Sequence, residues 1–130
     1  MHQAPLQTYA KVQANSCNSG NLLLLYYSKT RGEIQKAIIL MESADEADRL
    51  AAQSRLVKAH LGVLELDKTL NFEALPALAE ALHKLYLHIL LLLGEGMTEG
   101  SSASLQRAHS MLGELQESWE QAVRQTGKSA

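Results

Sequence analysis

The chain has 130 residues and a formal net charge of −2, with 46% apolar and only 5% aromatic side chains. This length suits a single domain with its own hydrophobic core. The near-neutral charge and the lack of a basic cluster exclude the usual electrostatic signature of a nucleic-acid-binding protein. A single cysteine, Cys17, excludes an internal disulfide, so nothing requires an oxidising compartment.

Targeting and membrane-spanning patterns are also lacking. The first residues have neither the basic start nor the apolar run of a signal peptide. The longest unbroken apolar runs, residues 22–27 and 89–93, fall well short of the roughly 18 residues that cross a bilayer. We therefore expect a soluble, cytoplasmic protein without membrane insertion. Abundant leucine and alanine with only two prolines predict an all-α domain.

The first segment, residues 1–17, is polar with isolated apolar residues such as Tyr9 and Val12. We predict that it forms a loosely held N-terminal arm. A first helix is expected over about residues 19–42, capped by polar side chains within residues 18–21. Gly32 in its middle predicts the close approach of a neighbouring helix.

A second helix is expected over about residues 44–70, starting at a capping box that runs from Ser43 to Glu46. Its apolar side chains spread over roughly 220°, whereas an ordinary surface helix buries a stripe a little over 100° wide. This helix is therefore either buried on two sides or offers one side to a partner. His60 and Asp67 share one side, which indicates a partly buried pair or water-satisfied groups rather than polar contacts to a bound peptide.

The third helix is expected over about residues 76–93, with Pro76 in its first turn and an end at Gly94 to Gly96. The fourth is expected over about residues 102–124, capped by one of the serines at 101, 102 and 104, with residues 126–130 as a disordered tail. Short connections then predict an antiparallel four-helix bundle over residues 18–125.

Catalysis finds no support in the residue pattern. Glu80 and His83 form one Glu-x-x-His, but a di-iron bundle needs a second such motif and two more inward glutamates. The other histidines lack zinc-ligand spacing, and neither a nucleophile elbow nor a glycine-rich phosphate loop is present. We expect no enzyme activity, no metal site and no cofactor.

Four leucines, at positions 25, 66, 87 and 91, exceed what one four-helix core can hold. Burying one leucine contributes roughly 1.5–3 kcal/mol. Three or four of them against a partner could support binding at about the micromolar level after ordering costs. The surplus therefore predicts a partner-binding surface.

Several stretches resemble the FliS family of flagellin export chaperones, in the family's order. They are the arm with Tyr9 and Val12, the run from Leu22 to Tyr27, residues 58–73 including Leu70-Asn71-Phe72-Glu73, the pairs Ala81-Leu82 and Leu85-Tyr86, and residues 112–119. The chain departs from the family at Leu91 and Leu92, where a pair of arginines is usual, so it resembles a divergent member or a paralogue.

The resemblance implies a cytoplasmic chaperone that binds the disordered C-terminal segment of flagellin or of a related filament subunit. It would prevent premature polymerisation and deliver the subunit to the flagellar type III export apparatus, with the N-terminal arm lying over a groove. An export-gate protein and an anti-sigma factor are further candidate partners, and a monomer or weak dimer is expected. The alternative is a helical self-association or adaptor module without a flagellin client.

The residues expected to contact the partner come from the arm, the first three helices and the joint between the second and third. They are Tyr9, Val12, Leu25, His60, Val63, Leu66, Leu70, Phe72, Leu87 and Leu91.

Overall fold

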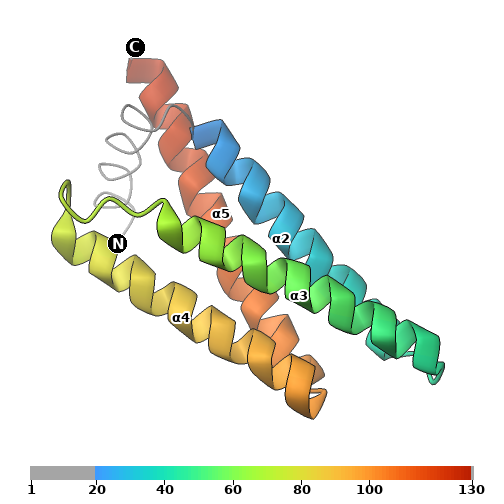
Figure 1. Ribbon diagram of the computed structural model, residues 1–130. Coiled ribbons are helices and arrows are strands. Elements are labelled where there is room, and N and C mark those ends of the chain that lie inside the picture. Colours follow the sequence, from blue (N-terminus) through green and yellow to red (C-terminus); the bar gives the residue numbers. More distant parts are fainter. Residues whose placement is uncertain (1–19, 130) are drawn as a thin grey trace.

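The computed structural model describes residues 20–129 of the chain, and all of its regular structure there is helical (Figure 1). The helices are α2 (Gly20–Met41), α3 (Glu46–Lys68), α4 (Pro76–Glu99) and α5 (Ser102–Ser129). The predicted all-α bundle is therefore confirmed. The predicted arm, with Tyr9 and Val12, lies outside the described residues.

The four helices form a closed ring of neighbours. Each one packs against the next along the chain, and α5 returns to pack against α2, so α2 faces α4 and α3 faces α5 across the diagonals (Figure 1). Short connections reverse the chain after every helix, as in an up-down-up-down bundle. α3 has a neighbour on each flank, α2 on one and α4 on the other, which accounts for much of its wide apolar arc.

The core is built from one apolar cluster with a polar centre. All four helices contribute side chains spaced three and four residues apart. At the centre, the hydroxyl groups of Tyr27 and Tyr86 lie 2.5 Å apart, and Trp119 Nε1 donates to the Tyr27 hydroxyl at 2.8 Å. All three residues are at most 2% exposed. These bonds connect α2, α4 and α5 through the interior.

Two glycines let neighbouring helices approach closely. A Cβ built on Gly62 would lie 2.2 Å from Thr30 Oγ1 of α2, and one built on Gly96 would lie 2.2 Å from Leu105 Cδ2 of α5. The prediction that Gly32 marks such an approach is wrong, because nothing lies within 4 Å of a Cβ built there.

The helix ends follow local capping chemistry, and three predicted boundaries are wrong. α3 begins at Glu46, because Asp45 rather than Ser43 accepts the hydrogen bond from the backbone N–H of Ala47. α4 passes through the predicted stop at Gly94 to Gly96 and ends before Gly100, whose φ of 67° provides the left-handed cap. α5 runs to Ser129, so the predicted disordered tail is helical as far as that residue.

Two further predicted features of helix starts are confirmed, whereas the side chains of the predicted cap within residues 18–21 lie outside the described part of the chain. Ser101 Oγ accepts the backbone N–H of Ser104 at 3.1 Å, as an N-cap does. Pro76 occupies the first turn of α4, where its missing N–H removes no helical hydrogen bond. Ahead of it, Asn71 Oδ1 accepts the backbone N–H groups of Glu73 and Ala74 and shapes the joint between α3 and α4.

Candidate partner-binding surface

The predicted contact residues divide into an exposed group and a buried group. Leu25, Phe72, Leu87 and Leu91 are between 44% and 59% exposed, so they are available to a partner. His60 and Leu70 are half-buried at the bundle surface. Val63 and Leu66 are fully buried.

The assignment of Val63 and Leu66 to a partner surface is therefore wrong. Both point into the core, on the side of α3 that also carries the buried residues Ala52, Leu56 and Ala59. Val57 and Leu61, on the opposite side of the same helix, are 45% and 55% exposed. The excess of apolar residues on α3 does leave apolar side chains exposed, but they are Val57 and Leu61 rather than the predicted Val63 and Leu66.

Helical geometry places several apolar side chains of α3 and α4 on the same outer side of the bundle. Gln53 Nε2 donates to the Met97 carbonyl at 3.0 Å, and Asp67 Oδ1 lies 2.7 Å from His83 Nδ1. These two contacts fix the antiparallel register of the helices. By helical geometry, that register brings Val57 level with Leu91 and Leu64 level with Leu87 on the side turned away from the core. We call Val57, Leu64, Leu87 and Leu91 the α3/α4 face.

The α3–α4 joint adds an aromatic side chain at the end of this face. Phe72 is 44% exposed and packs edge-to-face on the ring of His83, with ring centroids 6.1 Å apart. His83 in turn is held by Asp67. The partner of Asp67 is thus His83 from α4 and not His60, which lies about two turns earlier on the same side of α3.

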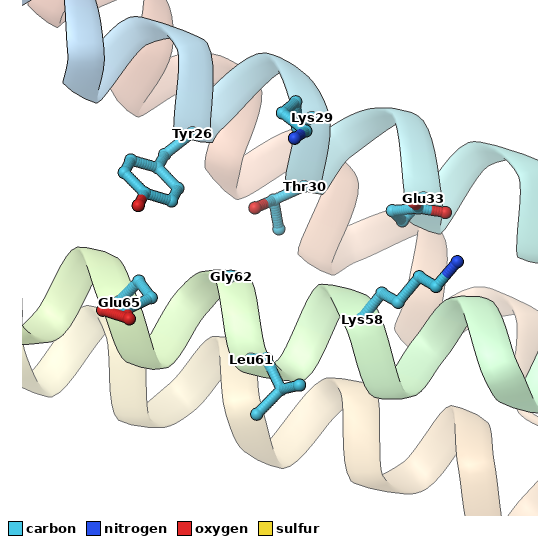
Figure 2. Close-up of a pocket in the computed structure, with 8 residues that line it drawn as sticks. All are labelled: Tyr26, Lys29, Thr30, Glu33, Lys58, Leu61, Gly62 and Glu65. Atoms are coloured by element: carbon cyan, nitrogen blue, oxygen red, sulfur yellow. The ribbon is translucent and has the colours of Figure 1, made fainter.

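A cleft lies between α2 and α3, where Gly62 packs against Thr30 (Figure 2). Its volume is about 390 Å³. Arg55 donates to Glu33 at 2.9 Å and ties the two helices together near one end. The residues that line the cleft were not predicted as contact residues: Tyr26, Lys29, Thr30, Glu33, Lys58, Leu61, Gly62 and Glu65. We call this the α2/α3 cleft.

The α2–α5 side of the bundle is polar by contrast. Arg31 Nη1 donates to Gln116 Oε1 at 3.0 Å, and Gln116 Nε2 donates to Ser28 Oγ at 2.9 Å. Burial, and then the positive charge of Arg31, lower the pKa of His109 below its ordinary value of 6.5. Among the described side chains, no large exposed apolar residue lies on α5. Exposed apolar surface is therefore concentrated on α2, α3, α4 and the α3–α4 joint.

The Glu-x-x-His motif on α4 does not form part of a metal-ligand cluster among the described residues. Within residues 20–129, no group of three or more histidine, cysteine, aspartate or glutamate side chains is placed to hold a metal ion. Glu80 is exposed, and its motif partner His83 is engaged by Asp67. In this part of the chain, α4 is the one helix whose length and composition would allow it to cross a membrane, a property shared by core helices of soluble proteins.

A helical bundle with exposed apolar side chains has surfaces of the kind that amphipathic helices of other proteins bind. Comparison with known proteins identifies the family. The family model described as flagellar protein FliS matches residues 1–126, and the chain belongs to that family. A comparison with curated proteins gave no match. FliS proteins are flagellar export chaperones that bind flagellin, and the family is not known for enzyme activity.

Proposed function

We propose that this protein acts in the cytoplasm on the C-terminal segment of flagellin or of a related filament subunit. It would keep the subunit from polymerising and deliver it to the flagellar type III export apparatus. The supporting observation is that Val57, Leu87 and Leu91 on the α3/α4 face, and Leu61 at the α2/α3 cleft, are exposed apolar side chains. Monomeric proteins seldom expose large contiguous apolar patches without a binding partner.

The physical mode of binding is the folding of client helices into these surfaces. A disordered segment that folds on binding spends part of its contact energy on ordering, which suits a client that must be released again. The N-terminal arm, through Tyr9 and Val12, is proposed to cover a groove until the client displaces it. Delivery requires contact with an export-gate protein, and an anti-sigma factor is a further proposed partner.

Calorimetric titration with a synthetic C-terminal flagellin segment from the same genome tests this proposal. We expect saturable one-to-one binding with a negative heat-capacity change, because apolar surface is buried. Leu91→Arg should weaken binding and leave the fold intact, since Leu91 is 59% exposed. Ile39→Arg is the matched control, because Ile39 is 57% exposed and lies on α2 away from both surfaces.

The alternative, self-association through the same face, predicts a different result. Sedimentation would then show a stable dimer that Leu91→Arg dissociates, and the flagellin segment would not bind.

Trp119→Ala separates folding from binding, since Trp119 is buried in the core. Its removal should cost about 3–5 kcal/mol of unfolding free energy.

A further inference from the structure

The α2/α3 cleft carries charges that the fold itself does not pair. Within residues 20–129, the ion pairs closer than 4.0 Å are Arg55–Glu33 and His83–Asp67. Lys29, Lys58 and Glu65 line the cleft and have no such partner among the described residues. Glu33, the acidic residue across the cleft from Lys58, is taken by Arg55. The cleft therefore presents charges that are available to a ligand.

Glu65 and Lys58 lie toward opposite ends of the cleft, with Lys29 of α2 between them. Figure 2 shows Tyr26 and Glu65 at one end, with the tyrosine hydroxyl directed toward α3, and Lys58 at the other end near Glu33. Lys58 and Glu65 are seven residues apart on α3, which is about 10 Å along the helix axis. Between them, Gly62 packs against Thr30 at the floor, and Leu61 supplies an apolar rim.

Seven residues is also the spacing at which side chains recur on one face of any α-helix. A helix lying along the cleft would place two such side chains opposite Glu65 and Lys58, with an apolar residue over Leu61. Opposite charges would then be paired at both ends as the cleft is covered. Pairing of this kind fixes the register of a bound helix and disfavours other segments.

We propose that the α2/α3 cleft selects a client helix that carries one basic and one acidic side chain about two turns apart on its apolar face. The basic group pairs with Glu65 beside the Tyr26 hydroxyl, and the acidic group pairs with Lys58. This inference rests on the proposed function, because the client is the flagellin-type segment that the protein escorts. The α3/α4 face, built from aliphatic side chains, contributes affinity without this selection.

The client sequence provides the first test. The segment must contain a basic and an acidic residue about seven positions apart on an amphipathic face, and a segment without such a pair overturns the inference. Titration of this segment into Glu65→Lys and into Lys58→Glu should raise the Kd by at least about tenfold in each case. Arg107→Glu and Glu114→Arg are matched controls, since these exposed residues have the same spacing on α5, and the Kd should stay within about twofold.

A charge exchange gives the decisive result. A peptide with its basic and acidic residues exchanged should bind the Lys58→Glu/Glu65→Lys double variant more tightly than the wild-type protein. Urea unfolding checks that the variants remain folded. If the segment binds but the cleft and control variants have equal affinities, or if the exchange restores nothing, the inference fails and the proposed function stands. If the segment does not bind the wild-type protein, the proposed function fails, and the inference fails with it.

Discussion

Removal of the Tyr27 hydroxyl should destabilise the bundle strongly, because that oxygen lies at the centre of the core. It is hydrogen-bonded to the Tyr86 hydroxyl at 2.5 Å and accepts from Trp119 Nε1 at 2.8 Å. Loss of a buried hydrogen bond of this kind costs about 1–2 kcal/mol, so Tyr27→Phe should cost about 2–4 kcal/mol. Tyr86→Phe removes one of the two bonds and should cost about 1–2 kcal/mol.

Equilibrium unfolding in urea, followed by far-ultraviolet circular dichroism, measures these changes. For a domain of this size the Tyr27→Phe midpoint should fall by about 1–2 M urea. Tyr26→Phe is the neighbouring control, because Tyr26 is part-exposed beside the cleft, and its effect should stay within about 0.5 kcal/mol. The double variant Tyr27→Phe/Tyr86→Phe should be less than additive, since one bond is shared. A Tyr27→Phe protein that unfolds at the wild-type midpoint would refute this account of the core.

Three further predictions concern helix contacts, capping and pH. Gly62→Ala should lower the thermal midpoint, because the added Cβ meets Thr30 Oγ1, whereas Gly94→Ala has open space around it and should raise the midpoint through helix propensity. Asp45→Ala should cost about 1 kcal/mol of unfolding free energy, measured in urea, through loss of the α3 cap. The lowered pKa of His109 means that the unfolded chain binds this proton more readily, so stability should fall as pH drops through about 6.5. His109→Gln should flatten that part of the stability–pH profile.

A specific result would contradict each of these three predictions. Equal midpoints for the two glycine variants would show that α2 and α3 do not approach closely at Gly62. An Asp45→Ala protein as stable as wild type would place the α3 cap elsewhere. A His109 resonance that titrates at or above pH 6.5 in nuclear magnetic resonance spectra would contradict the lowered pKa.

The helices themselves were predictable because apolar spacing and capping residues are local signals. The helix ends were less predictable, because more than one nearby residue could cap or stop each helix and tertiary packing decides which one does. Gly96 looked like a helix stop, but it remains helical because Leu105 packs against it, and the left-handed turn falls at Gly100. Asp45 and Ser43 are both competent caps, and the structure uses the aspartate.

The candidate site was harder to predict, because α3 is apolar on two sides. Periodicity groups Val63 with Leu66 and Val57 with Leu61, but it does not show which group faces inward. Packing with α2 at Gly62 decides this, and it depends on Thr30, which is 32 residues earlier in the sequence. The Asp67–His83 pair likewise depends on the register of α3 against α4. The α2/α3 cleft arises only once both helices are placed.

The central claim is that the α3/α4 face and the α2/α3 cleft hold the client. Nuclear magnetic resonance mapping of the isotope-labelled protein with a saturating C-terminal flagellin segment tests it most directly. Amide shifts should change most around Leu61, Leu87 and Leu91 and least along the outer side of α5. Changes concentrated on α5, or no change at saturating peptide, would contradict the claim.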